Sequence, residues 1–502
     1  FYTPREIVNY MVDESLIAYL TTACPELEEA SIRLLFNQDE LAEELAQSSE
    51  KRNKLATAIR SAKMLDPACG SGAFPMGMLN RMLDILQKLS TVAVHVETPC
   101  LASLQYETKL HLIENCIYGI DIQTIAVQIT KLRFFISLVC EQTPTDNAND
   151  NYGILALPNL ETKFVAANTL IGLKKDFSDK LDLQNDELKV LKNQLLDIRH
   201  KHFSAPNVNE KHKLRKQDAE LRKDIKAYLI ESSTKPNAYK IELLKNQLLE
   251  LKSQKKQYED EKWEDTTLKP KQQVALDFGF DTLPETQPTI FLIDVNKQKR
   301  DEIDALIKQT ENEIIREESK THIDGFEDEA EKLAHWNPYD QNTSSPFFDP
   351  EWMFGIKEGF DVVIGNPPYH QLSKDASATD DYKLYLKNRF NTSGGRLNTF
   401  IFFTHLGVQI LKQNGVISYI IPNTILSQDY YKETRKYLLD ETIIKKIVSY
   451  DHLPFENAVV ENITFVCVKN KIENNLIYHY VDNFRTIISD FVKQKADFYK
   501  TD

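Results

Sequence analysis

The chain has 502 residues, room for two to four domains at roughly 150 residues each. Its formal net charge of −14 argues against general coating of nucleic acid, although an acidic protein can contain a local basic cleft. The six cysteines show no C-x-x-C spacing, and no apolar run reaches the roughly 18 residues of a membrane span. With no signal peptide either, we expect a soluble, cytoplasmic protein without a bound metal, a disulfide scaffold or a membrane partner.

The chain opens with the signature of a helix start. Thr3 precedes Pro4 and is followed three residues later by Glu6, the spacing of a capping box with proline at the first helical position. Apolar residues then recur on one side of the predicted helix, at Ile7, Val8, Met11, Val12 and Leu16. We therefore predict a helix that Thr3 caps.

A loop of small residues follows the apolar pair Met64 and Leu65. Residues 66–72 read Asp-Pro-Ala-Cys-Gly-Ser-Gly, and a segment rich in methionine and leucine follows at 76–89. Glycines let such a loop turn tightly and let a ligand approach the backbone. The spacing is not that of a dinucleotide loop, and there is no Lys-Ser/Thr pair for a triphosphate. The pattern predicts a strand, a ligand-binding loop and a helix.

Two further strands are predicted, each with a polar side chain near its end. Residues 116–122 give a strand that ends at Asp121, and residues 163–170 give one that ends at Asn168. An acid at the end of the second strand of a Rossmann-like unit can accept both ribose hydroxyls of a nucleoside. Asp121 could also cap the helix predicted over 125–138, and the two roles are compatible.

Residues 174–336 form a highly charged stretch with heptad-like apolar spacing, at Leu181, Leu188, Leu191, Leu195 and Ile198 and again at Ile241, Leu244, Leu248 and Leu251. We predict two or three long helices in an antiparallel hairpin or short coiled coil, with breaks near 204–207 and 232–237. A strand is expected at 287–294 and a helix at 299–320. Lysines alternate with acids, which favours a solvated surface over a DNA-binding one. We expect that a short linker could replace the whole stretch.

Residues 360–369 combine a buried strand with a stiff turn. The apolar run 362–364 ends at two prolines, which restrict φ and donate no backbone hydrogen bond. Asn366 precedes a proline and is biased away from helix, so its amide oxygen and the nearby carbonyls are fixed acceptors. Tyr369 adds an aromatic ring. The segment predicts a site that holds a planar group by its amino hydrogens and stacks on its face.

The rest of the chain predicts one helix and three strands. The helix covers residues 398–411, and the strands cover 415–423, 443–449 and 462–468. A short irregular segment, His-Leu-Pro-Phe-Glu-Asn at 452–457, precedes the last strand and contains Phe455.

The Tyr-Thr-Pro opening, the 66–72 loop and Asn-Pro-Pro-Tyr at 366–369 resemble, in this order, the gamma class of DNA methyltransferases that modify the exocyclic amino group of adenine. The opening and the long insertion resemble the methylase part of type IIG restriction–modification enzymes. The resemblance covers the first 170 residues and about 360–470. It implies an α/β fold, a Rossmann-like S-adenosylmethionine-dependent methyltransferase sheet with a long helical, coiled-coil-like insertion. The implied domains are a cofactor-binding half (1–173), the insertion (174–336), a catalytic half (337–470) and the start of a further region (471–502).

The resemblance also implies roles for single residues. The cofactor would be held by Thr3, Asp66, Ala68, Gly70, Gly72, Asp121, Ile122 and Asn168. Thr3 would contact the methionine carboxylate, Ile122 would pack on the cofactor adenine, and Asn168 would bind its amino group. Asn366 and the Pro367 carbonyl would accept the two hydrogens of the target amino group. Tyr369 would stack on the flipped base, joined by Phe455, which could equally be a core aromatic.

Double-stranded DNA is the implied partner, in a restriction–modification system. Asn-Pro-Pro-Tyr also serves methylation of protein glutamine amides, so a protein or RNA substrate stays an alternative, as does a scaffold role for the insertion. A further alternative is a bifunctional restriction enzyme whose nuclease lies outside these residues. The nearest match to an Asp…Glu-x-Lys nuclease pattern, at 328–332, falls in a predicted helix. We expect a recognition or nuclease domain on the same longer chain.

Overall fold

The structure is a computed structural model. It describes residues 3–37, 41–91, 100–142, 144–173, 186–233, 238–260, 295–318, 326–375, 378–390, 396–450, 461–470, 475–482 and 486–494. The strand expected at 287–294 and Phe455 lie outside the described residues. The chain divides into two compact units, one made of Phe1–Lys223 and Lys332–Asp502 and the other of Asp224–Glu331.

Nine strands in the described residues form one mixed sheet in the order β3-β2-β1-β4-β5-β7-β6-β8-β9. Their bounds are β1 Met64–Asp66, β2 Ile117–Asp121, β3 Phe164–Ala166, β4 Phe360–Gly365, β5 Leu411–Pro422, β6 Thr442–Ser449, β7 Asn462–Lys469, β8 Asn475–Asp482 and β9 Thr486–Gln494. Strands β3, β2, β1, β4 and β5 run parallel to one another, and β7 is antiparallel to both β5 and β6. Strand β8 is parallel to β6 and antiparallel to β9. The predicted α/β fold is confirmed.

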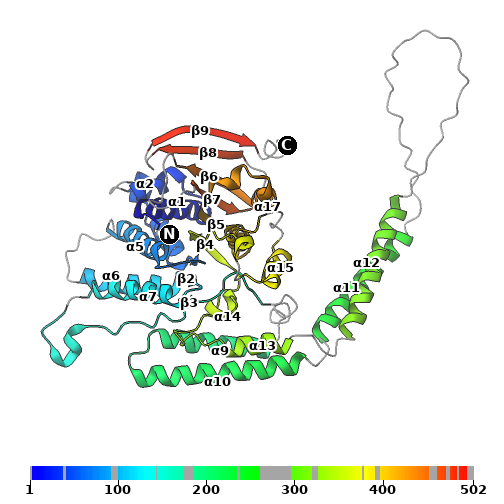
Figure 1. Cartoon of the computed structure of the whole chain (residues 1–502), viewed down its shortest axis with the longest axis horizontal. Helices are drawn as coiled ribbons and strands as arrows, with labels where there is room; N and C mark the ends of the chain where they lie inside the picture. The colour runs from blue at the N-terminus through cyan, green and yellow to red at the C-terminus, as the bar shows by residue number, and fades with distance from the viewer. Residues whose placement is uncertain are drawn as a thin grey trace, which may run out of the picture. The chain divides into compact units, whose positions relative to one another are not determined.

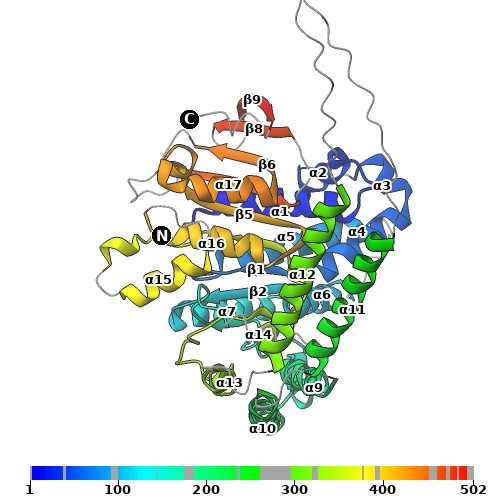
Figure 2. The same cartoon turned by 90° about the vertical axis from the view of Figure 1, so that its right-hand side faces the viewer.

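Helices cover both faces of this sheet. Helices α1 (Arg5–Ala23), α5 (Ala73–Thr91) and α7 (Thr124–Val139) lie on one face, and α16 (Thr399–Gln409) and α17 (Lys432–Glu441) lie on the other (Figures 1 and 2). Val362 and Ile364 in β4 and Val416 in β5 are almost fully buried in the core that α1 helps to form. Burial on both faces explains why the central strands read as continuous apolar runs.

Further helices belong to the same unit. They are α2 (Glu29–Asn37), α3 (Glu43–Gln47), α4 (Ser49–Ser61), α6 (Cys100–Asn115), α14 (Pro350–Phe354) and α15 (Asp380–Arg389), with 3-10 turns at Ala148–Gly153, Leu372–Lys374, Asn423–Leu426 and Asp429–Tyr431. No helix in the part of the chain that the structure describes is long and apolar enough to cross a membrane.

The predicted cap of the opening helix is wrong. Helix α1 begins at Arg5, Pro4 occupies the N-cap position, and no side chain caps the helix. Thr3 therefore lies one residue before the cap. Its hydroxyl accepts a hydrogen bond from the side chain of Asn366 instead.

The charged stretch contains α9 (Asp186–Phe203), α10 (Val208–Ser233), α11 (Ala238–Asp260), α12 (Val295–Glu318) and α13 (Phe326–His335). The break expected near 204–207 is confirmed, and residues 234–237 of the second expected break lie outside the described residues. Within the second unit, Lys252 pairs with Glu311 at 2.8 Å and Lys255 pairs with Asp304 at 2.6 Å. One residue number rises as its partner's falls, so α11 and α12 are antiparallel, whereas the hairpin was expected among the helices before residue 287 and the helix at 299–320 was expected to be separate from it. Helix α9 and α10 up to Lys223 belong to the first unit.

Candidate active site

Four parallel strands bring the sequence motifs to one edge of the sheet. Met64 of β1 pairs with Ile117 of β2 on one side and with Val362 of β4 on the other, and β3 pairs with β2. The carboxyl ends of parallel strands meet at the same edge, where open α/β sheets bind ligands. The 66–72 loop, Asp121, Asn168 and Asn366 each follow one of these strands, so segments far apart in the chain converge there.

The 66–72 loop, which we call the glycine loop, is held by its neighbours. The Gly70 N–H donates to Asp121 Oδ2 at 2.9 Å. From α7, the Thr130 hydroxyl donates to the Gly70 carbonyl at 3.0 Å and Arg133 Nη1 donates to the Ser71 carbonyl at 2.8 Å. Polar groups on both sides of the loop backbone are therefore satisfied by side chains from β2 and α7. Sequence reasoning missed Thr130 and Arg133, since they lie in an apolar helical run.

The two glycines serve different purposes. Gly70 and Gly72 have φ values of 54° and 78°, which side chains rarely adopt. A Cβ atom at Gly72 would lie 2.7 Å from Thr130 Cγ2, whereas one at Gly70 would meet nothing within 4 Å. Cys69, just before Gly70, is 5% exposed, and burial raises the pKa of its thiol, so the thiol stays protonated. These properties suit a small filler and not a nucleophile.

Asp66, the first residue of the glycine loop, packs against β4, the strand before Asn366. It is 2% exposed, and its Oδ1 accepts from the Ala68 N–H at 3.1 Å. A Cβ at Gly365 would lie only 2.6 Å from Asp66 Oδ1, so the carboxyl packs directly on β4. Burial, and to a smaller extent the charge of Asp121, raises the pKa of Asp66, and its Oδ2 has no hydrogen-bond partner among the residues that the structure describes. A buried polar atom without a partner is one that a ligand could satisfy.

Asp121, Ile122 and Asn168 surround the other side of the loop. Asp121 Oδ1 accepts from the Gln123 N–H at 2.9 Å, which supports the turn before α7, although Gln123 and not Asp121 is the N-cap. Ile122 is 59% exposed, an unusual position for a large apolar side chain beside a polar loop. The Asn168 N–H donates to the Ser345 carbonyl at 2.9 Å, and its Oδ1 accepts from the Leu170 N–H at 3.2 Å.

Asn366 and the prolines after it, with Tyr369, form what we call the proline loop. Asn366 Nδ2 donates to Thr3 Oγ1 at 3.2 Å, which leaves the amide oxygen Oδ1 as an acceptor. Within the described residues, neither Asn366 Oδ1 nor the Pro367 carbonyl accepts a hydrogen bond. The next carbonyl, of Pro368, accepts from the Thr399 hydroxyl. Two adjacent acceptors therefore remain available at the edge of the sheet.

Tyr369 is held at both ends of its side chain. Its hydroxyl donates to the Ile420 carbonyl at 2.7 Å, and its ring meets Phe400 edge-on with centroids 6.2 Å apart. Burial raises the pKa of Tyr369, so the phenol stays neutral. The His370 N–H donates to Thr399 Oγ1 at 2.9 Å and fixes the end of the loop. Sequence reasoning saw Thr399 and Phe400 only as the start of a helix.

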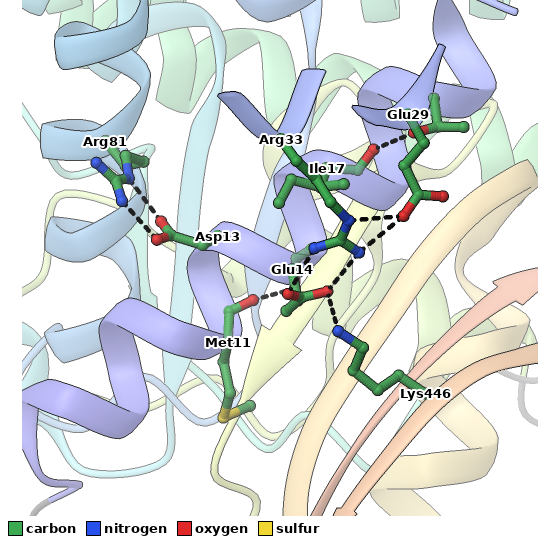
Figure 3. Close-up of polar contacts among 10 residues, drawn as sticks. Met11, Asp13, Glu14, Ile17, Glu29, Arg33, Arg81 and Lys446 are labelled. Carbon is green, nitrogen blue, oxygen red and sulfur yellow. Dashed lines mark hydrogen bonds and ion pairs between the residues drawn. The ribbon is translucent and has the colours of Figure 1, made fainter. Parts of the chain in front are cut away.

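Ion pairs anchor α1 (Figure 3). Thr3, two residues before the start of this helix, contacts Asn366. Arg81 of α5 binds Asp13 with an Nε–Oδ1 distance of 2.6 Å. Glu14 contacts Arg33 of α2 at 2.9 Å and Lys446 of β6 at 2.8 Å. Burial opposes ionisation of Glu14, but hydrogen bonds and charges from these two bases lower its pKa overall. The helix is therefore tied to α5 and to the far half of the sheet.

All but one of the site residues expected from the sequence thus lie at or next to one edge of the sheet, and Phe455 lies outside the described residues. Those at the edge are Thr3, Asp66, Ala68, Gly70, Gly72, Asp121, Ile122, Asn168, Asn366, Pro367 and Tyr369. The edge combines a backbone loop, a carboxylate and an exposed aliphatic side chain with two free carbonyl acceptors. This arrangement can hold a nucleoside-containing ligand beside a planar group that bears an amino function.

Residues 115–455 match the family described as Eco57I restriction-modification methylase. The chain is 25% identical, over 517 residues, to a putative type II restriction enzyme and methyltransferase of Methanocaldococcus jannaschii, an alignment that covers 98% of this chain and 38% of that protein. It is 23% identical over 152 residues to the type II methyltransferase M.AccI of Acinetobacter calcoaceticus, covering 29% of this chain and 28% of that protein. The chain thus covers well under half the length of these relatives.

Two solved structures show more distant similarity. The type IIL restriction-modification enzyme MmeI in complex with DNA aligns with a TM-score of 0.39 and 10% identity, over 98% of this chain and 40% of that one. The M protein of the type I restriction enzyme EcoKI aligns with a TM-score of 0.35 and 7% identity, over 96% and 48% of the two chains.

Proposed function

Since the chain belongs to the Eco57I restriction-modification methylase family, we propose that it transfers a methyl group from S-adenosylmethionine to the exocyclic amino group of adenine in double-stranded DNA. The observation that carries the proposal is the pair of uncommitted acceptors, Asn366 Oδ1 and the Pro367 carbonyl, at the sheet edge that also holds the glycine loop.

The two acceptors address the difficulty of the reaction. The adenine amino nitrogen is a poor nucleophile because its lone pair is delocalised into the ring. Acceptors that hold both hydrogens favour a tetrahedral nitrogen and return the lone pair to it. Their dipoles are fixed beforehand, because Thr3 holds the Asn366 amide and proline restricts the backbone, so no reorganisation is needed during the reaction. The site needs no metal or covalent enzyme intermediate for this step.

The residues around the glycine loop fit S-adenosylmethionine. Asp121 has carboxylate lone pairs for ribose hydroxyls beyond those that Gly70 and Gln123 use. Ile122 exposes an apolar surface for a purine ring, the space beside Gly70 is open, and Asp66 Oδ2 is a buried atom without a partner. When bound, the cofactor supplies an electrophilic methyl group. Asn168 follows β3 and could contact the amino group of the cofactor adenine.

A base within a duplex is out of reach of this edge, so the target adenine would have to be flipped out of the helix. Tyr369 would then stack on the flipped base, and its hydrogen bond to the Ile420 carbonyl and its contact with Phe400 hold the ring in place beforehand. Base–aromatic stacking contributes about 1–3 kcal/mol. Phe455 remains a predicted second contact.

The experiment that tests the function uses the full chain, S-adenosylmethionine with a tritiated methyl group, and unmodified plasmid DNA that is then digested to nucleosides. We expect the label in N6-methyldeoxyadenosine. Asn366→Ala should slow labelling by about 10²–10³-fold, whereas Asn312→Ala, at an exposed asparagine of α12, should not change it. Label in a cytosine would contradict the proposal. Label on a protein glutamine or on RNA, with none on DNA, would favour the alternative substrates.

The biological setting is also a proposal. The Methanocaldococcus jannaschii relative is named as both a restriction enzyme and a methyltransferase, and the chain covers 38% of it. We propose that methylation by this chain works together with a recognition or nuclease region outside these residues. The surrounding reading frame tests this, because a frame with neither region on the same chain or in an adjacent gene would contradict it.

A further inference from the structure

Three charged side chains are buried where α9 meets α10. Asp218 is 0% exposed, Arg199 is 4% exposed and Arg222 is 6% exposed. Arg199 Nε lies 3.0 Å from Asp218 Oδ2, and Arg222 Nε lies 2.7 Å from Asp218 Oδ1. We call these residues the Arg-Asp-Arg cluster. One carboxylate thus orients two guanidinium groups, whose remaining donors can point elsewhere.

Those donors hold both ends of a segment that returns to the sheet, residues 336–352, which we call the return segment. Arg222 Nη1 donates to the carbonyls of Ala334 and Trp336, each at 2.7 Å. Arg199 Nη1 donates to the Trp352 carbonyl at 2.6 Å, and its guanidinium lies 5.0 Å from the centroid of the Trp336 ring. The cluster therefore fixes where the return segment begins and where it ends.

The middle of the return segment contacts the candidate site directly. The Ser345 N–H donates to the Ala166 carbonyl at 2.8 Å, and the Asn168 N–H donates to the Ser345 carbonyl at 2.9 Å. Further along, the Phe348 N–H donates to the Ile171 carbonyl at 2.8 Å. These bonds extend the pairing of β3 beyond its end and hold the backbone on both sides of Asn168.

A buried cluster of charges is a poor source of stability, because removing the charges from water opposes their attraction. The cluster instead determines the geometry of its hydrogen bonds, since the planar guanidinium group of arginine fixes the angle at which each N–H donates. Here the bonds end on three backbone carbonyls, that of Ala334 just before the return segment and those of Trp336 and Trp352 at its two ends. An apolar contact between the same helices would not select those carbonyls.

We propose that the Arg-Asp-Arg cluster positions Asn168 for the cofactor adenine, so that α9 and the start of α10 are part of the cofactor site, while the unit Asp224–Glu331 is not. The inference rests on the proposed function, in which Asn168 contacts the amino group of that adenine. It revises the expectation that a linker could replace the whole of residues 174–336.

The chain leaves and re-enters the first unit at neighbouring points. The Arg222 side chain contacts the Ala334 carbonyl, so the residues that flank Asp224–Glu331 lie close together. A short glycine-serine linker can therefore span the distance between Lys223 and Lys332.

The first test measures S-adenosylmethionine affinity by calorimetry in Asp218→Asn. We expect affinity to fall roughly three- to ten-fold, the size of one hydrogen bond, with kcat at saturating cofactor little changed. The matched control is Glu220→Gln on the same helix, whose exposed carboxylate faces Lys216 at 3.9 Å. Arg222→Lys, which keeps the charge but loses the planar fork, is a second variant in case Asp218→Asn does not fold.

A cofactor analogue separates positioning from general loosening. If hydrogen replaces the 6-amino group of the cofactor adenine, Asn168 has no partner to bind. The wild type and Asp218→Asn should then bind the analogue equally well. Equal weakening for the cofactor and the analogue would show a structural defect only and overturn the inference, as would unchanged cofactor affinity in both cluster variants.

The second test replaces Asp224–Glu331 with the short linker. Cofactor affinity within about two-fold of the wild type is expected, since no hydrogen bond of the site is lost. A large loss of cofactor affinity would overturn the inference that the unit Asp224–Glu331 is not part of the cofactor site. Failure of the proposed function would give other results. Either the wild type and the variants would differ in cofactor affinity as described but the wild type would not methylate DNA, or the wild type would not bind the cofactor.

Discussion

The glycine loop and the proline loop lie at the same edge of the sheet but obtain their shapes in opposite ways. The glycine loop has two residues with positive φ, and side chains from elsewhere, Asp121, Thr130 and Arg133, bond its backbone. The proline loop is restricted by its own covalent structure, because proline limits φ at Pro367 and Pro368. Its contacts with the rest of the chain, to Thr3, Thr399 and the Ile420 carbonyl, only orient its side chains and carbonyls.

This difference predicts which substitutions should affect each loop. A glycine-rich segment has a large conformational entropy when free, so the ordered loop depends on its neighbours and on having no side chain at the tight positions. A proline-rich segment has lost much of that entropy already in the unfolded chain. Changes around the glycine loop should therefore alter cofactor binding, whereas changes in the proline loop should alter the chemical step.

The largest expected effect is on the chemical step. Asn366→Ala removes an acceptor that acts on the reacting amino group, and loss of one such preorganised group typically lowers kcat by about 10²–10³-fold. Cofactor affinity should stay near wild type, because the glycine loop makes no hydrogen bond to the Asn366 side chain. Single-turnover methylation and calorimetry measure the two quantities. A matching loss of cofactor affinity would remove the contrast between the loops.

Next in size is Asp121→Ala, which removes the proposed ribose acceptor and the bond to the Gly70 N–H. Loss of a charged acceptor costs about 1.5–3 kcal/mol, or roughly ten- to a hundred-fold in affinity. Calorimetry with S-adenosylmethionine checks this, and Asp121→Asn, which keeps one acceptor oxygen, should lose less. If Asp121→Ala bound the cofactor normally, Asp121 would be only a support for the turn.

A comparison of the two glycines sharpens the picture. Gly70→Ala introduces the positive-φ penalty alone, about 1–2 kcal/mol, because nothing lies near the new Cβ. Gly72→Ala adds a clash with Thr130 Cγ2 at 2.7 Å and should destabilise more in denaturant unfolding. Adding Thr130→Ser removes that methyl group and keeps the hydroxyl, so it should recover part of the difference for Gly72→Ala and none for Gly70→Ala.

The smallest effect is expected at Thr3, which only aims the proline loop. Thr3→Val removes the acceptor of the Asn366 amide and should lower kcat by about two- to ten-fold, the range of one neutral hydrogen bond. Thr3→Ser keeps the hydroxyl and should behave like the wild type. If Thr3→Val instead raised KM for the cofactor with kcat unchanged, Thr3 would be a cofactor contact, as the sequence resemblance implies.

Much of the fold could be predicted because the information is local. Apolar runs such as 362–364 and 116–120 gave buried strands, helical spacing gave α1, α7 and α16, and the polar breaks near 204–207 separated α9 from α10. The glycine and proline loops were also visible, since each depends on residue types whose backbone restrictions are intrinsic. The order of motifs along the chain was enough to place them at the ends of parallel strands.

What only the tertiary structure decided is which distant groups meet. Thr3 has the sequence signature of a helix cap, yet its hydroxyl accepts a hydrogen bond from Asn366, 363 positions further along the chain, because the fold brings the two segments together. In the sequence, Arg199, Asp218 and Arg222 resemble the other charged residues of a solvated helical stretch, but they are buried. Lys252 and Glu311, from the same charged stretch, are exposed. Helical periodicity describes one helix at a time. The partner that a face meets depends on contacts between elements, and these form only when the whole chain folds.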